Sequence, residues 1–284
     1  MFKNRLNDLS AKEWIKFQKS WFELNPARRP KDVLVHPAKF PEELVSEFIR
    51  FFTKSGQTVL DPMVGTGSTL LACISTGRRG VGIELNPKYV AIASKRIAES
   101  FEGAITTLHN GAVQRGTSEG KSVSGAIRPL LLEGDARQLD RFDLPEIDYC
   151  ITSPPYWDML RAKGARTQKR RQEAGLDVFY SSDNRDLGNI AEYERFVDEL
   201  VAVFSKVHAV MRLGAYLTVV VKNVKKKGRI YPLAWDIGKR LGEIFALKDE
   251  RIWCQGDQRL SPFGIGNAWV SNTFHHYCLN FRKE

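Results

Sequence analysis

Residues 58–69 read TVLDPMVGTGST, and this stretch decides the fold that the 284-residue chain is expected to adopt. The run TVLD is short, apolar and closed by an acid, which is typical of a buried strand. Gly65 and Gly67 follow in a loop, where glycine allows φ > 0 and a close approach of the backbone to a ligand. Residues 69–76, TLLACIST, have a helical pattern that ends at Gly77. Strand, glycine loop and helix in this order indicate one unit of a parallel α/β sheet.

The segments on either side continue the alternation of helix and strand. Residues 42–53 place apolar side chains on one helix face after Pro41, and residues 79–84, RGVGIE, are typical of a second buried strand. Asn86 and Pro87 then supply a cap and a first turn for another helix. The pattern predicts the beginning of a parallel sheet.

The second half of the chain carries the remaining predicted elements. We expect strands within residues 129–135 and 147–156, the second of which stops at a Pro-Pro pair because proline cannot continue a central strand. Apolar residues at 3- and 4-residue steps predict a long helix from Tyr193 to near Gly214. A fifth strand is expected at 215–221, a helix at 231–241, and closing antiparallel strands at 251–255 and 276–282.

The chain shows no internal repeat, and we predict a single α/β domain over residues 1–284. Residues 102–128 are rich in glycine, serine and threonine and poor in large apolar side chains. Such a composition predicts a flexible insertion between the helix that follows the second strand and the third strand.

Bulk composition narrows the classes of function. The chain has 43 Lys and Arg against 33 Asp and Glu, a formal net charge of +10, which favours a polyanionic partner. Its four cysteines form no C-x-x-C pair, which argues against a zinc site or a disulfide framework. No apolar run reaches the roughly 18 residues that a membrane span needs, and the N-terminus lacks a secretory signal pattern. We therefore expect a cytoplasmic protein without a metal site or a membrane partner.

Three acids follow successive predicted strands: Asp61 after the first, Glu84 after the second and Asp135 after the third. In open parallel sheets, ligands bind beyond the carboxyl ends of the strands. Glu84 is placed to accept both ribose hydroxyls of a nucleoside, and Asp135 to meet a base amino group. Any one of these acids could be a solvated loop residue, but their common placement favours a nucleoside site. The loop lacks the third glycine of G-x-G-x-x-G, which argues against a pyrophosphate ligand.

The tetrapeptide SPPY (153–156) ends the fourth predicted strand. Its Pro-Pro pair could serve only to terminate the strand, yet a serine before it and an aromatic residue after it form a chemically useful set beside a nucleoside site. Together with DPMVGTG (61–67), it resembles the DNA amino-methyltransferases, which carry a D-P-F-x-G-x-G-T loop and a [DNS]-P-P-[YFW] strand end. The chain departs from that pattern at Met63, where phenylalanine is common, although a flexible thioether can fill the same space.

The resemblance covers most of the chain and implies a mostly parallel, seven-stranded, Rossmann-like sheet with a reversed last hairpin. It implies S-adenosylmethionine as the methyl donor, double-stranded DNA as the substrate and residues 36–101 as the cofactor-binding half. The implied catalytic residues are Ser153, Pro154, Pro155 and Tyr156. The implied cofactor-binding residues are Lys39, Phe40, Asp61, Pro62, Met63, Gly65, Gly67, Ser68, Thr69, Glu84 and Asp135.

The chemistry of the tetrapeptide suits transfer of a methyl group to an exocyclic base amine. Ser153 Oγ and the Pro154 carbonyl can accept hydrogen bonds from that amine and direct its lone pair at the methyl group. Tyr156 offers a π face for a base turned out of the duplex. Serine in the first position is typical of cytosine-N4 members, so N4-methylcytosine is the expected product and N6-methyladenine the alternative.

Two weaker interpretations remain, an RNA base methyltransferase and a non-catalytic DNA-binding partner subunit. No appended RNA-binding module is visible, and the intact acids and tetrapeptide argue against loss of activity. A cognate restriction endonuclease would be a functional partner, and the chain is expected to be a monomer or a homodimer.

Residues 157–189 and 255–273 are the expected DNA-recognition loops. The stretch 161–171 carries six cations and no acid, which predicts contacts with phosphates, although a solvated loop would have the same composition. The three lysines at 225–227 are a smaller case of the same kind. The predicted DNA-binding residues are Arg161, Lys163, Arg166, Lys169, Arg170 and Arg171.

Overall fold

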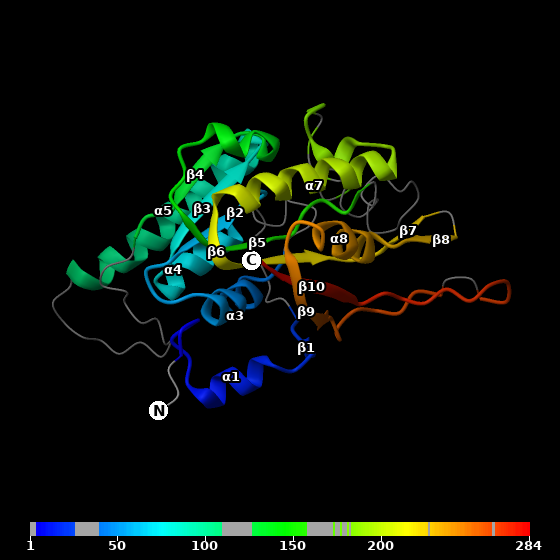
Figure 1. Ribbon diagram of the computed structural model, residues 1–284, viewed down its shortest axis with the longest axis horizontal. Coiled ribbons are helices and arrows are strands. Elements are labelled where there is room, and N and C mark those ends of the chain that lie inside the picture. Colours follow the sequence, from blue (N-terminus) through cyan, green and yellow to red (C-terminus); the bar gives the residue numbers. More distant parts are fainter. Residues whose placement is uncertain are drawn as a thin grey trace.

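The structure, a computed structural model, shows a central sheet with helices packed around it (Figure 1). The described residues are 4–25, 40–109, 127–157, 173, 177, 181, 183–226, 228–262 and 265–284, with the backbone alone for 102–109. The strands are β1 (Trp21–Glu23), β2 (Thr58–Asp61), β3 (Arg79–Glu84), β4 (Leu130–Glu133), β5 (Ile147–Thr152), β6 (Met211–Val221), β7 (Val224–Lys226), β8 (Arg229–Tyr231), β9 (Ala246–Cys254) and β10 (His275–Arg282). The helices are α1 (Ala11–Phe17), α3 (Glu42–Phe52), α4 (Ser68–Thr76), α5 (Pro87–His109), α7 (Tyr193–Val210) and α8 (Leu233–Leu241), with 3-10 turns η1 (Ala136–Arg141) and η3 (Leu187–Asn189).

Within the described residues, eight strands form one sheet in the order β1-β9-β10-β6-β5-β2-β3-β4, and β7 pairs with β8 in a separate hairpin. In the large sheet, β10 alone runs against its neighbours, so the mostly parallel sheet with a reversed last hairpin is confirmed. The predicted number of seven strands is wrong, because β1 adds a strand beside β9, where Trp21 pairs with Ile252. Three residues are too few for strand periodicity to show in the sequence, and their partner lies far along the chain.

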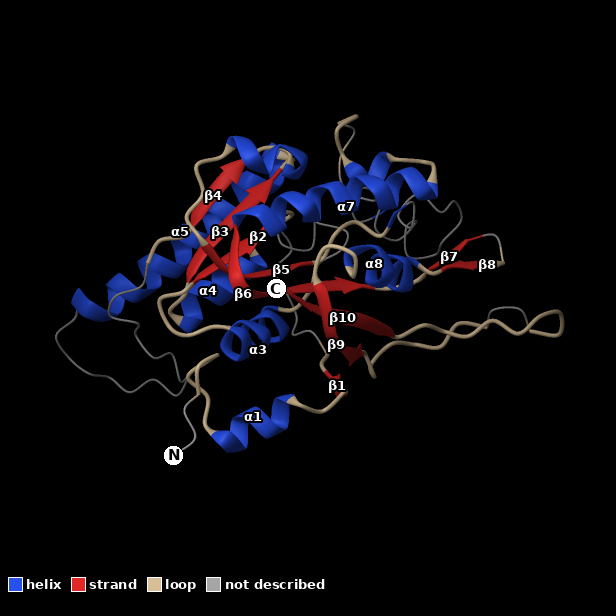
Figure 2. Cartoon of the chain, in the orientation of Figure 1, coloured by secondary structure: helices blue, strands red, loops and turns tan. Residues whose placement is uncertain are grey.

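Helices cover both faces of the sheet (Figure 2). α3, α4 and α5 lie on one face, and α7 and α8 lie on the other. In β2, Val59 packs in the cluster that includes α3, whereas Leu60 packs in the cluster that includes α7. Tyr149 and Cys150 in β5 divide in the same way. The central strands are buried on both faces, which is why they read as continuous apolar runs rather than as an alternating pattern.

The predicted elements around the glycine loop are observed almost as expected. β2 and β3 have the predicted bounds, and α3 and α4 each differ from theirs by one residue. β9 and β10 are the expected closing antiparallel pair, although β9 begins earlier than residue 251. In the described ranges, no helix has the length and apolar character that crossing a membrane requires.

Several predicted boundaries are wrong. α5 continues to His109, so residues 102–109 are helical and not a flexible insertion, because extending a formed helix costs little per residue. Residues 110–126 of that insertion lie outside the described part of the chain. α7 ends at Val210 rather than near Gly214, since Met211 is already extended and begins β6. Tyr231, expected in a helix, lies in β8.

His276, on β10, is a buried group that should tie stability to pH. Its ring stacks on Trp253 with centroids 4.5 Å apart, and Nδ1 has no hydrogen-bond partner among the described residues. Burial, helped by the charge of Lys222, lowers the pKa of His276 to about 3. The folded state therefore keeps this imidazole neutral at a pH where the unfolded chain binds a proton.

We predict that the free energy of unfolding falls as the pH drops below about 6.5, by up to ~1.4 kcal/mol per pH unit from this group. His276→Gln should remove that part of the slope, and His208→Gln, at a half-buried position on α7, should leave most of it. Urea unfolding of the three proteins between pH 7.5 and 5 measures the difference. Equal slopes for the wild type and His276→Gln would show that His276 is not held neutral by the fold.

Candidate active site

The loop after β2 turns sharply into α4. Gly65 and Gly67 have φ of 55° and 87°, the left-handed conformation that the sequence predicted for these glycines. At Gly67 a Cβ atom would lie 3.0 Å from the Cβ of Ala93 in α5. Glycine at this position therefore serves both the turn and the close packing of α4 against α5.

Asp61, at the end of β2, is anchored inside the protein. Its carboxylate accepts hydrogen bonds from Thr69 Oγ1 in α4 (2.5 Å), from Thr152 Oγ1 at the end of β5 (2.7 Å) and from the amide of Met63 (3.1 Å). The side chain is 1% exposed. Burial raises the pKa of Asp61 to about 6, against the lowering effect of the two hydroxyls. This carboxylate joins the glycine loop, the start of α4 and the strand that leads into the tetrapeptide.

Glu84 ends β3, the neighbouring strand, and faces the pocket described below. Its carboxylate accepts the amide hydrogens of Gly65 and Asn86, each at 2.8 Å. Burial raises the pKa of Glu84 to about 7, although these two amides oppose the shift. Each carboxylate oxygen retains acceptor capacity beyond the one bond that it makes.

Asp135 follows β4 and caps the 3-10 turn η1 by accepting the amide of Arg137 at 2.9 Å. The Arg137 guanidinium also lies against this carboxylate, with Nη2 2.8 Å from Oδ2. Arg137 in turn reaches Glu199 on α7 and the carbonyl of Arg185. Asp135 is therefore fixed in place, with its orientation set by an ion pair that the sequence did not reveal.

The tetrapeptide begins one residue after β5. Ser153 Oγ lies 2.9 Å from the Tyr156 hydroxyl, which also contacts the carbonyl of Val220 on β6 at 3.3 Å. Tyr156 is 6% exposed, and burial raises the pKa of its hydroxyl well above the ordinary value. Its ring has two neighbours that sequence reasoning missed, His276 with centroids 6.0 Å apart and Lys222 with Nζ 6.0 Å from the ring centre. The face predicted to stack on a base is thus not open to solvent in this structure.

Trp157 shows local strain next to the tetrapeptide. Its φ is 47°, the one left-handed non-glycine residue in the described part of the chain. The indole is 4% exposed, and its Nε1 has no hydrogen-bond partner in the part of the chain that the structure describes. The ring packs against Tyr193 and Tyr231, and Lys226 Nζ lies 4.2 Å from its centre. Residues held in sparsely populated backbone conformations cluster at functional sites, and this one directly follows the predicted catalytic motif.

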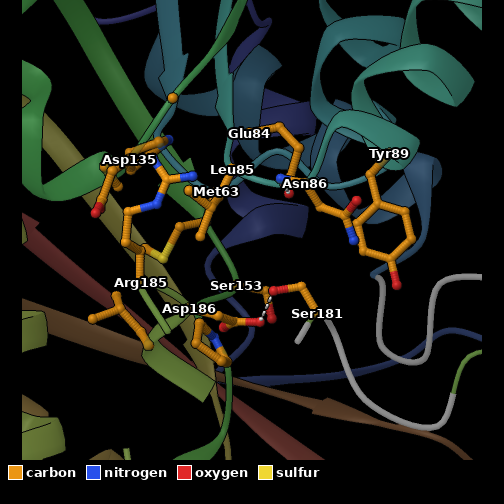
Figure 3. Close-up of a pocket in the computed structure, with 15 residues that line it drawn as sticks. Met63, Glu84, Leu85, Asn86, Tyr89, Asp135, Ser153, Ser181, Arg185 and Asp186 are labelled. Atoms are coloured by element: carbon orange, nitrogen blue, oxygen red, sulfur yellow. Dashed lines mark hydrogen bonds between the residues drawn. The ribbon is translucent and has the colours of Figure 1, made fainter. Parts of the chain in front are cut away.

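A pocket of about 620 Å³ opens beyond the carboxyl ends of β2, β3, β4 and β5 (Figure 3). Asn86 and Tyr89 lie on one side of the view and Asp135 and Arg185 on the other, with Ser153 between them. This mixture of apolar and convergent polar groups suits a small-molecule ligand. The lining residues are Pro62, Met63, Glu84, Leu85, Asn86, Tyr89, Gly134, Asp135, Ala136, Ser153, Pro155, Ser181, Arg185, Asp186 and Leu187.

The predicted site residues divide into three groups. The pocket brings together Pro62, Met63, Glu84 and Asp135 from the cofactor set and Ser153 and Pro155 from the tetrapeptide. Buried residues that do not line it are Phe40, Asp61, Gly65, Gly67, Ser68, Thr69, Pro154 and Tyr156. Outside the described residues lie Lys39, Arg161, Lys163, Arg166, Lys169, Arg170 and Arg171.

The pocket also contains residues that sequence reasoning missed. Asn86 was expected only as a helix cap, a role it fulfils by accepting the amide of Lys88 at 3.0 Å. Residues 181 and 185–187 contribute one wall of the pocket. Asp186 accepts hydrogen bonds from the amide of Gly188 and the hydroxyl of Ser181, and these bonds fix that wall. No pattern pointed to this wall, because it comes from a polar loop that lies distant in sequence from the glycine loop.

Comparison with known families identifies the first third of the chain. Residues 3–95 match the family model described as DNA methylase. The resemblance to the DNA amino-methyltransferases is confirmed. The match includes the glycine loop and Glu84 and ends before the tetrapeptide.

Two relatives are Type II methyltransferases. The chain is 38% identical over 95 residues to M.BglI of Bacillus subtilis, which covers 34% of this chain and 26% of that protein. It is 34% identical over 111 residues to M2.DpnII of Streptococcus pneumoniae, which covers 34% of this chain and 41% of that protein. The matched segments thus span less than half the length of either relative.

The fold is that of the α/β methyltransferases. The crystal structure of TrmN from Thermus thermophilus superposes with a TM-score of 0.53 at 16% identity, over 91% of this chain and 55% of that one. At this identity the likeness concerns the fold alone.

We predict that the hydrogen bonds to Asp61 stabilise the site. Thr152→Val and Thr69→Val should each lower the free energy of unfolding by about 1–3 kcal/mol, because each leaves a buried carboxylate with a missing donor. Thr152→Ser keeps the hydroxyl and should lose less. Urea unfolding checks these values, with Thr58→Val as the matched control, since this buried threonine on β2 bonds Asp148 through its backbone amide. A Thr152→Val loss no larger than that of Thr58→Val would contradict the prediction.

Proposed function

We propose that this protein is an S-adenosylmethionine-dependent DNA methyltransferase that methylates the N4 amine of cytosine in duplex DNA. The observation that supports it most is the meeting of two motifs in one pocket. Glu84, beside the glycine loop of the DNA methylase match, and Ser153 of the tetrapeptide line the same cavity. A cofactor held by the first would therefore lie beside a substrate held by the second.

The residues present fit S-adenosylmethionine. Glu84 offers half-buried acceptor oxygens suited to a ribose, and Asp135, which follows the neighbouring strand β4, lines the same cavity. Met63 lines the cavity and packs partly buried against the core. When bound, S-adenosylmethionine supplies an electrophilic methyl group on a sulfonium sulfur.

The chain's own contribution to transfer is positioning. Ser153 Oγ and the Pro154 carbonyl accept hydrogen bonds from the base amine, whose lone pair is then turned away from the ring and into the pocket. The Tyr156 hydroxyl, 2.9 Å from Ser153 Oγ, fixes the orientation of that acceptor. Tyr156 stacks on the extruded base once its ring is uncovered, and the cost of extrusion is offset by this stacking and by contacts to the base edge.

Serine in the first position of the tetrapeptide supports cytosine N4 as the target, with adenine N6 as the second candidate. The stretch 161–171 is proposed to bind phosphates, and residues 157–189 and 255–273 to recognise DNA. We further propose that the chain is a single domain, that its partner in the cell is DNA and that a cognate restriction endonuclease is a functional partner.

The product identifies the reaction. Purified protein, S-adenosylmethionine and unmethylated DNA of mixed sequence should give N4-methylcytosine when the DNA is digested to nucleosides and measured by mass spectrometry. Ser153→Ala should lower the rate about 10²–10³-fold, as loss of one oriented hydrogen-bonding group does at other polar transition states.

Two controls accompany this measurement. Ser153→Ala should bind S-adenosylhomocysteine normally, and Ser75→Ala, on the exposed side of α4, should keep the wild-type rate. N6-methyladenine alone would promote the second candidate. Methylated RNA with unmodified DNA would overturn the proposal.

The raised pKa of Glu84 predicts how cofactor affinity depends on pH. Ribose hydroxyls donate to a carboxylate, so the ionised form binds better, and protonation below pH 7 competes with binding. The affinity for S-adenosylhomocysteine should be up to ~10-fold weaker at pH 6 than at pH 8. Calorimetry at several pH values measures this trend.

Glu84→Gln should bind weakly and with a flat pH profile. Glu133→Gln is the matched control, because Glu133 pairs with Glu84 across β3 and β4 but is exposed. A wild-type profile that stays flat between pH 8 and 6 would remove Glu84 from the ligand contacts.

A further inference from the structure

A basic hairpin extends from the strand beside the catalytic one. Residues 222–231, KNVKKKGRIY, contain five cations and no acid, and they include β7 and β8 at the end of β6. Lys225 and Arg229 are exposed, and neither forms an ion pair with the described residues. Exposed cations without a carboxylate partner are suited to a polyanion.

A second projection lies beside this hairpin. The arm is the name used here for residues 255–262 and 265–274, the described part of the connection between β9 and β10, which extends away from the sheet on the same side as β7 and β8 (Figure 1). Asn272 holds the two sides of the arm together, accepting the amide of Ser261 and donating to its carbonyl, each at 2.9 Å. The arm carries apolar side chains in solvent, with Trp269 90% exposed and Ile265 76% exposed.

The two projections are joined to each other and to the tetrapeptide. Lys225 Nζ donates to the carbonyl (2.5 Å) and to Oγ (2.8 Å) of Ser271 on the arm. Lys226 lies over the ring of Trp157, the residue that follows the tetrapeptide. The basic hairpin, the arm and the residue that follows the tetrapeptide are therefore linked by direct contacts at the carboxyl edge of the sheet.

We propose that the basic hairpin and the arm hold the DNA duplex on one side of the target base. Lys225 and Arg229 bind phosphates, and Trp269 lies in a groove of the duplex against the base edges. This inference rests on the proposed function. The basic hairpin and the exposed apolar side chains of the arm fit DNA, because phosphates attract the cations and the grooves admit apolar side chains.

The length of the arm sets where these contacts fall. Trp269 stands six residues before β10, which corresponds to about 20 Å at the rise of an extended chain. At ~3.4 Å per base pair this distance equals about six base pairs. This reach of at most about six base pairs allows Trp269 to contact the flank of the site, where the proposal places it.

The first test separates direct phosphate contacts by Lys225 and Arg229 from the effect of the protein's overall positive charge. The slope of log K against log[salt] changes by about 0.9 for each phosphate contact. Lys225→Met/Arg229→Gln should flatten the slope by up to ~1.8, on a specific or a scrambled duplex alike. The matched control Lys12→Gln/Lys16→Gln removes two exposed cations from α1 and should leave the slope unchanged.

The second test locates the arm on DNA. Trp269→Ala should weaken binding about tenfold to a 30-base-pair duplex centred on the methylated site, with Trp235→Ala, a 59% exposed tryptophan on α8, as the control. Two further duplexes are each shortened on one side, so that only about three base pairs remain upstream of the site in one and downstream of it in the other. The Trp269 effect should vanish on one of these two duplexes. S-adenosylhomocysteine binding confirms that each variant is folded.

An unchanged salt slope, or a Trp269 effect that persists on both shortened duplexes, would overturn the proposal. A change of oligomeric state in Trp269→Ala without a change in DNA affinity would assign the arm to contact with a second copy of the chain. Wild-type methylation is measured first, so that a protein that methylates no DNA refutes the proposed function separately from this inference.

Discussion

The structure of the site depends on one buried carboxylate. Asp61 accepts hydrogen bonds from Thr69, Thr152 and the Met63 amide while 1% exposed. Burying a charge is costly unless hydrogen bonds compensate, and here the donors come from three different segments. The glycine loop, α4 and the end of β5 must therefore be in register for the carboxylate to be satisfied. This constraint couples the half that would bind a cofactor to the strand that carries the tetrapeptide.

The sequence located Asp61 but not its role. Its place at a strand end beside a glycine loop suggested a ligand contact, but Asp61 does not line the pocket, whereas Glu84 and Asp135 do. Whether an acid at a strand end faces a pocket or the interior depends on which donors lie around it. Thr152 stands 91 residues away, so no local pattern could reveal the bond.

The fold was predictable where it rests on local, strongly apolar signals and not where it rests on distant pairing. β2 and β3 are buried runs bounded by clear breakers, and their bounds were predicted correctly. β1 and the β7–β8 hairpin are three-residue strands with polar neighbours, and only the fold provides their partners. The wall of the pocket around Asp186 was also missed, because only the fold brings this segment next to the glycine loop.

Glu84 shows how the loop and the pocket depend on each other. One of its oxygens holds the amide of Gly65, so the acid that faces the pocket also fixes the loop on which the pocket is built. Since Glu84 and Asp61 bind opposite parts of that loop, one through Gly65 and the other through Met63, the loop conformation is set before any ligand arrives. A site shaped in advance loses less conformational entropy on binding. The two acids therefore have different roles. Asp61 does not line the pocket, and its hydrogen bonds join three segments. Glu84 lines the pocket and uses only part of its acceptor capacity on the loop, so the rest can accept hydrogen bonds from a ligand.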